Sequence, residues 1–553
     1  MTKLAIANQI LQADVVVVGS GLAGALVSYQ LASIGIDVLC LEAGPAINRF
    51  EVLQRFKMQP DRDFQECYVN TKHAPFPSGK ANDSYLQSSG PNDYTGSYIR
   101  GVGGTTWHWA GHAWRFLHED FQEKSLYGVG RDMPVTYDEL ESYYTQAENM
   151  MGVSGVSEPL NYYNVLRKHK YPLPPLPLSY LDTFVDQKIS SLGMRVKSAP
   201  SARNSEVFDQ RPPCCGSNNC MPICPVGAQY AAVMHLEKAQ GFPKMRLISN
   251  AVVNQIITND DRRIEELTYL DPQGVEHRVS AQHFVLAAGA IEIPKLLLMS
   301  NVGNDQVGRH LMDHPQQSFS FLAKEDVFPG RGPMVVGSII NHQTGAFRSE
   351  RAGFRLNLKN FFLMDEIVRQ QVAVGGMGAR LKNQIDLQAR RHVGIEIFYG
   401  QLPDANNRVV LSQTKKDALG LPHPEVHYTV GSWTEKSVKP AYDVCESIAK
   451  ACGYQKGSLM FESEHKDPKG RFNVSNHIMG TTVMGNDPKD SATDSLGRVY
   501  SRTKNEPMEN LFIASSSLLG ATGVSNVSLT IAALALRLAE HLKETLGRKN
   551  KEG

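Results

Sequence analysis

The stretch 13–45 constrains the fold more than any other part of the chain. It begins with a short apolar run rich in valine, which is typical of a strand buried on both faces. Gly19, Gly21 and Gly24 follow in G-x-G-x-x-G spacing, and a helical pattern and a second apolar run come next. This order predicts a βαβ unit whose glycine turn places a pyrophosphate at a helix N-terminus.

Glu42 ends the second apolar run of this unit. A carboxylate at that position accepts hydrogen bonds from the diol of a ribose. It repels a 2′-phosphate, because two like charges about 4 Å apart at an effective dielectric near 20 cost about 4 kcal/mol. The residues therefore predict FAD or NAD. The Glu-Ala-Gly-Pro run that starts at Glu42 resembles FAD-binding units more than NAD-binding units and favours FAD.

Charge and hydropathy exclude several classes of partner. The chain has 57 basic and 56 acidic residues and a net charge of +1, so nothing indicates binding to nucleic acid or to an anionic membrane surface. No run of about 18 uninterrupted apolar residues predicts a transmembrane helix. Residues 1–13 lack the pattern of a signal peptide. We therefore expect any membrane attachment to come from a partner.

The stretch 100–115 is the second glycine-rich element, and it holds three of the four tryptophans. Gly103 and Gly104 permit a close approach of the backbone to a ligand, and Thr105 and Thr106 add hydroxyl groups. The tryptophans offer flat surfaces that suit an aromatic ring. The composition predicts a loop that faces the cofactor, with a packed aromatic corner as the alternative.

Residues 103–106 resemble the Gly-Gly-Ser-Ser segment of the glucose–methanol–choline (GMC) oxidoreductases, which are FAD enzymes that oxidise alcohols. The stretches 287–300, 308–315 and 477–538 resemble three further segments of that family. The resemblance implies an α/β fold in which a Rossmann-like FAD-binding domain is interleaved with a substrate domain built on an antiparallel sheet.

The expected division of the chain has three parts. The FAD-binding domain takes residues 1–60, 95–130, 225–320 and 470–545, the substrate domain takes 61–94 and 321–469, and an insertion that ends in a cysteine loop takes 131–224.

The resemblance also places His108 and Trp109 beside the flavin. The Thr-Trp-His-Trp run after the paired glycines is similar to the histidyl linkage segment of pyranose oxidases in the same superfamily. That similarity implies a covalent bond between His108 and the flavin. A histidine packed against the ring without a bond is the alternative.

Four cysteines cluster in one loop rich in Pro, Gly and Asn. Cys214, Cys220 and Cys224 are spaced C-x5-C-x3-C, and Pro225 follows directly, as in the C-P ending of ferredoxin loops. A structural zinc usually takes two separated pairs of ligands, and a disulfide framework is unexpected in so long a chain. The pattern favours an iron–sulfur cluster. Cys214 and Cys215 are adjacent, so their side chains point to opposite sides of an extended loop and one of them is left over.

The sequence of this loop closely resembles the corresponding loop in the large subunits of bacterial membrane-bound dehydrogenases for gluconate, glucose, fructose and sorbitol, a group within the GMC family. The resemblance implies a [3Fe–4S] cluster on Cys214, Cys220 and Cys224, with Cys215 free for a disulfide to another subunit. It further implies a small subunit that carries the export signal and a membrane-anchored multihaem cytochrome c subunit that feeds the quinone pool. The expected location is the periplasmic side of the bacterial inner membrane.

The resemblance implies that His477 is the catalytic base and Asn526 its partner. Alcohol oxidation removes the hydroxyl proton while a hydride leaves the same carbon, and an imidazole with a pKa near 6.5 suits the first task. The Asn526 amide would hold the substrate oxygen. The alternative for Asn526 is the N-cap of the helix that follows it.

Taken together, the sequence predicts an FAD-dependent dehydrogenase that oxidises an alcohol group of a sugar, polyol or sugar acid. Two alternatives remain open: a cytoplasmic flavin oxidase that uses oxygen, and a non-enzymatic electron-transfer module with iron–sulfur or zinc. The cysteine loop argues against the oxidase, which needs no one-electron relay. The His477–Asn526 pair argues against the module.

Overall fold

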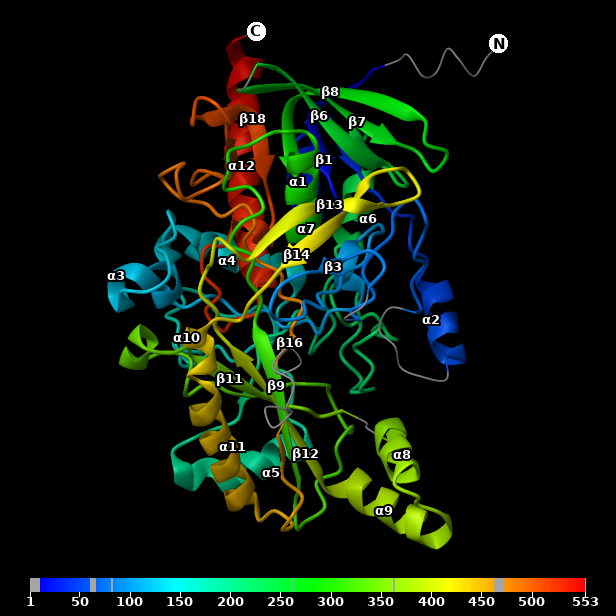
Figure 1. Cartoon of the computed structure of the whole chain (residues 1–553), viewed down its shortest axis with the longest axis vertical. Helices are drawn as coiled ribbons and strands as arrows, with labels where there is room; N and C mark the ends of the chain where they lie inside the picture. Colours follow the sequence, from blue (N-terminus) through cyan, green and yellow to red (C-terminus); the bar gives the residue numbers. More distant parts are fainter. Residues whose placement is uncertain are drawn as a thin grey trace.

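The structure is a computed structural model that describes residues 10–59, 66–80, 83–260, 262–361, 364–461 and 472–552. Residues 1–9, part of the stretch in which we expect no signal peptide, lie outside this described part. Figure 1 shows one large sheet with its helices in the upper half and a second sheet in the lower half. No helix among the described residues has the length and apolar character needed to span a membrane.

The large sheet is built around β1 (Leu11–Val18), as the N-terminal pattern predicts. β1 runs parallel to β2 (Val38–Leu41) on one side and to β8 (Glu276–Leu286) on the other. The strand order is β17-β18-β8-β1-β2-β5, and the antiparallel pair β6 and β7 extends from β8. The remaining strands are β5 (Met245–Ile248), β6 (Val252–Asp260), β7 (Arg263–Leu270), β17 (Arg498–Tyr500) and β18 (Pro507–Ile513).

Two helices bury one face of this sheet. α1 (Leu22–Ala32) follows the glycine turn, and nine of its 11 residues are buried. The long helix α12 (Ser528–Glu552) lies against α1, as Figure 1 shows in red at the end of the chain. Because α1 is covered by both the sheet and α12, it carries almost no polar surface.

The second sheet is antiparallel and has the order β15-β9-β12-β11-β10-β4, with β16 paired to β9. It confirms the predicted α/β fold with an antiparallel sheet beside the dinucleotide unit. Its strands are β4 (Lys197–Ser198), β9 (Pro315–Leu322), β10 (Gly337–Ile339), β11 (Phe354–Leu358), β12 (His392–Tyr399), β15 (Met460–Phe461) and β16 (Asn473–Val474). β4 comes from the expected insertion and β16 from the expected FAD-binding segment, so strands from several predicted segments share one sheet. The domain division itself stays a prediction.

A small sheet with the order β13-β14-β3 and the other helices complete the fold. The strands of the small sheet are β3 (Gln87–Ser88), β13 (Arg408–Lys416) and β14 (Pro422–His427). The helices are α2 (Arg49–Met58), α3 (Glu123–Tyr127), α4 (Tyr137–Met151), α5 (Tyr180–Ile189), α6 (Val233–Gln240), α7 (Gly289–Met299), α8 (Met364–Ala373), α9 (Gly378–Arg391), α10 (Ser432–Glu435) and α11 (Val438–Cys452).

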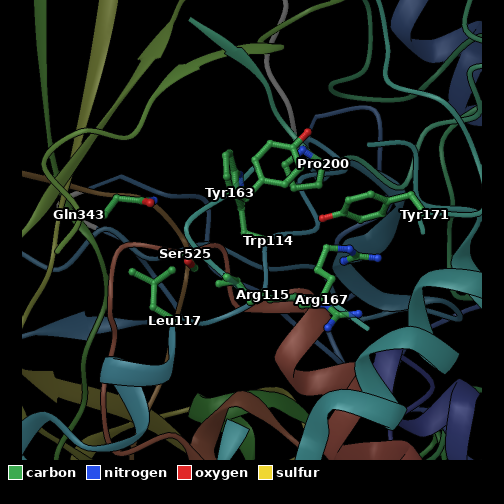
Figure 2. Close-up of a pocket in the computed structure, with 10 residues that line it drawn as sticks. Trp114, Arg115, Leu117, Tyr163, Arg167, Tyr171, Pro200, Gln343 and Ser525 are labelled. Atoms are coloured by element: carbon green, nitrogen blue, oxygen red, sulfur yellow. The ribbon is translucent and has the colours of Figure 1, made fainter. Parts of the chain in front are cut away.

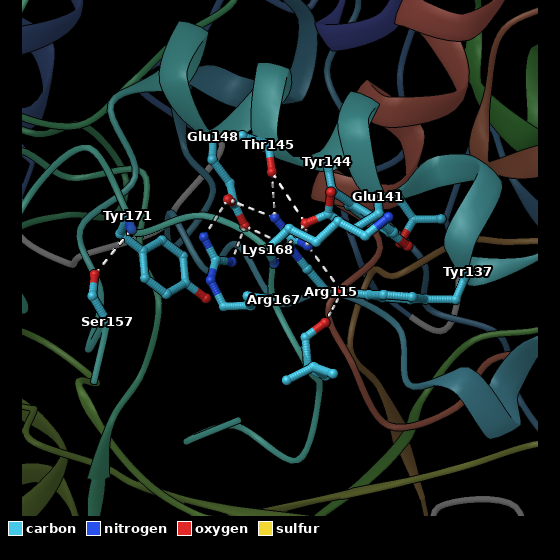
Figure 3. Close-up of polar contacts among 12 residues, drawn as sticks. Arg115, Tyr137, Glu141, Tyr144, Thr145, Glu148, Ser157, Arg167, Lys168 and Tyr171 are labelled. Carbon is cyan, nitrogen blue, oxygen red and sulfur yellow. Dashed lines mark hydrogen bonds and ion pairs between the residues drawn. The ribbon is translucent and has the colours of Figure 1, made fainter. Parts of the chain in front are cut away.

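A buried ion cluster fastens α4 to the rest of the molecule (Figure 3). The Glu148 carboxylate accepts hydrogen bonds from Arg115 at 2.8 and 2.9 Å and from Arg167 at 2.5 and 2.6 Å. Arg115 also donates to Glu141 at 3.1 Å. Burial by itself would raise the pKa of Glu148, but the two guanidinium groups overcome it and hold that pKa below its usual value. The cluster thus ties together three segments that are apart in sequence.

The same helix reaches the end of the chain. Tyr144 of α4 and Thr530 of α12 share a hydrogen bond of 2.8 Å between their hydroxyl groups. α4 therefore connects the Arg115 segment to α12, the helix that begins two residues after Asn526.

We expect Glu148→Gln to lower the free energy of unfolding by about 3–5 kcal/mol, because it leaves buried guanidinium charge uncompensated. Denaturant unfolding followed by tryptophan fluorescence measures the change. The matched control is Glu158→Gln, whose partner Lys170 is 3.1 Å away but whose pair is about two-thirds exposed, 66% for the Glu158 side chain and 69% for that of Lys170. This exposed pair is worth about 0–1 kcal/mol, so equal losses in the two variants would contradict a structural role for the cluster.

Candidate active site

A cavity of about 600 Å³ connects the two main sheets. One end is lined by the turn between β1 and α1, and the other by side chains of β9, β11 and β12, among them Gln316, Asn357 and Phe398. This volume lies in the range of cofactor and substrate sites, about 300–1,000 Å³. The cavity thus offers one continuous space from the dinucleotide unit to the second sheet.

The glycine turn forms one wall of the cavity, and its three glycines have different reasons to be there. A Cβ at Gly24 would lie 1.9 Å from the Gly19 carbonyl oxygen, so only glycine lets α1 begin so close to the strand. Gly19 has φ +99°, a conformation that favours glycine. A Cβ at Gly21 would meet no protein atom within 4 Å, because this residue faces the cavity. The space beside Gly21 fits the predicted pyrophosphate.

Glu42 lies at the cavity wall and holds the glycine turn in shape. One carboxylate oxygen accepts hydrogen bonds from the Ser20 backbone N–H at 3.0 Å and the Ser20 hydroxyl at 2.6 Å. The other accepts from the Gly44 N–H at 3.0 Å. Its predicted contact with a ribose stays a prediction, but its place at the end of β2 is the one that such a contact requires.

The second glycine-rich loop packs directly on the first. Gly103 has φ +94°, and a Cβ at Gly104 would lie 3.1 Å from the Gly21 Cα. The Thr106 hydroxyl donates to the Gly103 carbonyl at 2.6 Å and accepts from the Ala232 N–H at 2.9 Å. Thr106 therefore closes its own turn, and the two loops together build one side of the cavity.

The predicted site residues converge on this cavity. Apart from Gly24 and Gly103, which lie just behind the wall, all the residues that we assigned to the FAD site or to catalysis line it: Gly19, Gly21, Glu42, Gly104, Thr105, Thr106, His108, Trp109, His477 and Asn526. Within the described part of the chain, His108 Nε2 is buried without a hydrogen-bond partner, and burial lowers the pKa of its ring to about 4. A neutral nitrogen at the cavity wall suits both alternatives for His108, which stay predictions.

His477 and Asn526 meet although they are 49 residues apart. His477 lies in the loop after β16, Asn526 lies just before α12, and the Asn526 Nδ2 is 2.7 Å from His477 Nε2. The Asn526 amide oxygen accepts a hydrogen bond of 2.6 Å from Arg355. Both polar atoms of the amide are thus engaged at the site, which favours the catalytic interpretation over a helix cap.

Burial keeps the His477 imidazole neutral. It lowers the pKa of His477 well below the usual 6.5, and the neighbouring His314, Arg355 and His112 lower it further. The His477 ring also stacks on Phe398, with 5.8 Å between the ring centroids. A neutral imidazole in an apolar contact is able to accept a proton, as a base must.

Asp313 binds the backbone of both His314 and His477. One of its carboxylate oxygens accepts from the backbone N–H of His314 at 2.7 Å and of His477 at 3.0 Å. The other accepts from the Tyr94 hydroxyl at 3.2 Å. Burial raises the pKa of Asp313 to about 7. Asp313 therefore sets the distance between the loop 308–315 and the catalytic end of the chain.

Sequence reasoning missed the residues that the second sheet contributes. Arg355 and Asn357 both stand on β11, whose sequence FRLNL alternates apolar and polar residues. All five residues of β11 are buried, so its polar face does not point to solvent. Asn357 lines the cavity, and Arg355 contacts Asn526. The alternation was the available signal, although by itself it is equally typical of a strand with one exposed face.

Comparison with known proteins identifies the family of the chain. The model described as GMC oxidoreductase matches residues 187–316 in its N-terminal form and 403–535 in its C-terminal form. The chain is 39% identical to the fructose dehydrogenase large subunit of Gluconobacter japonicus, over 98% of this chain and 99% of that protein. The chain belongs to the GMC oxidoreductase family. It is an FAD-dependent oxidoreductase acting on CH–OH groups, which confirms the predicted family, enzyme class and flavin cofactor.

Two further relatives mark the breadth of this family. The chain is 26% identical to 2-methyl-1,2-propanediol dehydrogenase of Mycolicibacterium austroafricanum, over 96% of this chain and 95% of that protein. Among solved structures, pyridoxine 4-oxidase from Mesorbium loti superposes with a TM-score of 0.67 at 16% identity, over 96% of this chain and 99% of that one. The second likeness shows that the fold is shared over nearly the whole length of the chain.

The cysteine loop lies next to the same cavity. Met221, between two of the predicted ligands, lines it. Cys220 and Cys224 are buried, Cys214 is half-buried, and Cys215 is exposed. The adjacent Cys214 and Cys215 thus differ in exposure.

Arg203 brings positive charge to this loop, and it donates to the Cys220 sulfur at 3.3 Å. Burial raises the pKa of Cys214; Arg203 opposes this, while the neighbouring Cys220 and Cys224 add to it. The three thiols are thus close enough to influence one another, and they fit iron–sulfur ligands in kind. In the part of the chain that the structure describes, however, no group of three His, Cys, Asp or Glu side chains is arranged to hold a single metal ion.

A second cavity is too small to compete as the active site. It has about 10 Å³ and lies among Trp114, Arg167, Tyr171 and Ser525 (Figure 2). Ser525 immediately precedes Asn526, so this cavity lies close to the catalytic pair. Its volume is about that of one water-sized probe and excludes a sugar or a flavin.

We expect Gly21→Val to abolish flavin binding while the protein still folds. The added methyl groups would occupy the cavity where the pyrophosphate is expected, yet Gly21 has φ −68° and its Cβ would touch no protein atom. Flavin absorbance per polypeptide measures the loss, and circular dichroism checks the fold. Full flavin content in this variant would contradict the assignment of the turn.

Proposed function

We propose that this protein is the FAD-carrying catalytic subunit of a dehydrogenase that oxidises an alcohol group of a sugar, polyol or sugar acid. The observation that carries the proposal is the contact between His477 and Asn526 in a cavity that begins at the glycine turn. The similarity to a protein named fructose dehydrogenase large subunit supports the substrate class. Gluconate, glucose, fructose and sorbitol are the candidate substrates.

His477 acts as the base in this proposal. In the structure its neutral Nε2 meets the Asn526 amide; the substrate hydroxyl takes the place of that amide hydrogen bond and gives its proton to Nε2, and the amide then holds the substrate oxygen. The hydrogen on the same carbon leaves with its electron pair as the proton is taken. FAD, when bound, supplies the acceptor for that hydride. Burial of the pair in the cavity excludes bulk water and strengthens both polar contacts.

The far end of the cavity suits a polyhydroxylated substrate. Gln316, Asn357 and Glu396 line it from three neighbouring strands of the second sheet. Amide and carboxylate groups bind hydroxyl groups, whereas a purely apolar alcohol would make no polar contact with them. A panel of sugars, polyols and sugar acids with an artificial electron acceptor identifies the substrate.

We expect His477→Ala to slow the reduction of bound flavin by about 10²–10⁴-fold, since it removes the general base. Stopped-flow absorbance measures this step without any acceptor. Asn526→Ala removes the contact with His477 and also the bond from the charged Arg355, which is worth about 1.5–3 kcal/mol, so it should slow the step by about 10- to 100-fold, less than the loss of the base. Flavin content is the control for both variants. A His477→Ala protein that reduces its flavin at the wild-type rate would place the base elsewhere.

We further propose that Cys214, Cys220 and Cys224 ligate a [3Fe–4S] cluster. Thiolates on one short loop are the usual ligands of such clusters, and this loop adjoins the flavin cavity through Met221. The cluster, when bound, supplies one-electron transfer toward a cytochrome c. The Arg203 guanidinium donates a hydrogen bond to the sulfur of Cys220, one of the proposed ligands.

The partners and the location complete this proposal. Cys215 is exposed and therefore available for a disulfide to a small subunit that carries an export signal. A membrane-anchored multihaem cytochrome c subunit takes the electrons to quinone, and the complex lies on the periplasmic side of the inner membrane. The similarity to a protein named as a large subunit supports the existence of partner subunits.

We expect Cys214→Ser, Cys220→Ser and Cys224→Ser each to lower the iron content and to block electron delivery to a cytochrome acceptor. Reduction of bound flavin by substrate should persist, because the cluster acts after it. Cys215→Ser is the matched control and should retain the iron. Iron analysis and stopped-flow reduction separate the two effects. An equal loss of iron in all four variants would contradict the assignment of Cys214, Cys220 and Cys224 as ligands and of Cys215 as free.

A further inference from the structure

His477 is held by a hydrogen-bond partner on each side of its ring. Its Nε2 is 2.7 Å from the Nδ2 of Asn526, and its Nδ1 is 2.8 Å from the Nδ1 of His314. The rings of His314 and His477 meet nearly at right angles, 82°, with 5.0 Å between centroids. A neutral imidazole carries one proton, so these contacts leave two possible tautomers for each ring.

The two ends of this row remove the ambiguity. At one end the Arg355 Nη2 lies 2.6 Å from the Asn526 Oδ1, and at the other end the His314 Nε2 lies 3.1 Å from the Thr522 carbonyl oxygen. A guanidinium only donates hydrogen bonds, and a carbonyl oxygen only accepts them. The amide oxygen of Asn526 must therefore face Arg355, and His314 Nε2 must carry a proton.

The protons in between follow from these two ends. His314 in its neutral form has a bare Nδ1, which accepts from His477 Nδ1–H. His477 then has a bare Nε2, which accepts from the Asn526 NH₂ group. Every donor in the row Arg355, Asn526, His477, His314, Thr522 thus meets an acceptor. A proton on His477 Nε2 would instead face the donor group of Asn526.

We propose that Arg355 and His314 are positioning residues that fix, from opposite ends of this row, the tautomer of His477 with a bare Nε2. This inference rests on the proposed role of His477 as the base, because a bare Nε2 matters only if that atom receives the substrate proton. Arg355 acts through Asn526, and His314 acts directly on the other nitrogen of the ring. Neither residue needs to touch the substrate.

The surroundings of Arg355 agree with this role. Its side chain is 1% exposed and lies over the rings of Trp114 at 4.8 Å and Phe398 at 5.5 Å. Within the described residues its Nε and Nη1 have no hydrogen-bond partner, so the bond to Asn526 is the main polar contact of this guanidinium. Trp114 also belongs to the wall of the small cavity (Figure 2). The aromatic rings thus hold the guanidinium in one orientation.

The charges around the row keep both histidines neutral. Burial lowers the pKa of His314 to about 3, with Arg355 adding to it, and it lowers the pKa of Arg355 itself to about 9. Arg355 therefore stays protonated near neutral pH while the rings beside it do not. A neutral pair is the state in which the proton positions above are consistent.

The experiment reads the tautomers directly by ¹⁵N NMR of the oxidised, full-length protein with its flavin and with ring-labelled histidine. Protonated and bare ring nitrogens differ strongly in ¹⁵N shift, and His477→Gln and His314→Asn assign two of the 17 histidines. We expect a bare Nε2 on His477 and a protonated Nε2 on His314. The opposite tautomer of His477 in the wild-type protein would overturn the proposal.

Variants at both ends test which residues set this tautomer. Arg355→Met should convert His477 to a mixture of tautomers and slow flavin reduction by about 10- to 100-fold, the usual weight of a hydrogen bond to a charged group. Arg355→Lys keeps a charged donor and should retain most of the wild-type tautomer and rate. Likewise, His314→Asn keeps an acceptor near the position of Nδ1, whereas His314→Leu removes it and should give the mixture.

Arg351→Met is the matched control, since that arginine lies over Phe347, at 4.2 Å, four residues before Arg355. It should change neither tautomer nor rate. A wild-type tautomer in Arg355→Met would remove Arg355 from the proposal, and one in His314→Leu would remove His314. The NMR result does not depend on turnover. If His477→Ala reduced its flavin normally while the tautomers were as expected, the proposed base would be wrong and the positioning row would stand.

Discussion

The contact between Gly24 and the Gly19 carbonyl is the constraint on which the rest of the structure depends. A Cβ on Gly24 would lie 1.9 Å from that oxygen, so any other residue would push α1 away from β1. Because α1 starts at this distance, Gly21 faces an open cavity and the loop at Gly104 packs directly on it. The space for the cofactor is therefore left open by the absence of a Cβ at Gly21 and at Gly24.

The fold buries charged side chains in two different environments, at Glu148 and at Arg355. Glu148 is compensated by two guanidinium groups, and the resulting cluster is a structural joint between segments. Arg355 is buried against aromatic rings with one close hydrogen bond, to Asn526. Attraction from Glu396 offsets the desolvation of Arg355 only in part, and groups with strongly perturbed pKa values cluster at functional sites. The contrast between the Glu148 cluster and Arg355 separates the framework of the molecule from its active site.

The sequence predicted the parts of the site that depend on local pattern. The glycine turn, Glu42 and the loop at Gly104 were found because each needs particular residue types at fixed spacing, and they do line one cavity. His477 and Asn526 were found through resemblance to the GMC family and do lie in contact. Arg355 and Asn357 were not found, because the alternation in β11 looks the same whether its polar face meets solvent or a cavity. Segments far away in the sequence decide whether the polar face of a strand meets solvent or a cavity. A single sequence does not show which of these segments pack against the strand.

The catalytic end depends on both halves of the molecule at once. His477 and Asn526 flank the second half of the dinucleotide fold, whereas Arg355 belongs to β11 of the antiparallel sheet. Asp313 joins the two, since it binds the backbone of His477 at the point where β9 begins. A shift of one sheet against the other would therefore break the bond from Arg355 to Asn526 before it disturbed either sheet. The interleaving of the two domains opposes such a shift, because the chain passes several times from strands of one sheet to strands of the other. The interleaved order of the domains therefore keeps His477, Asn526 and Arg355 in contact.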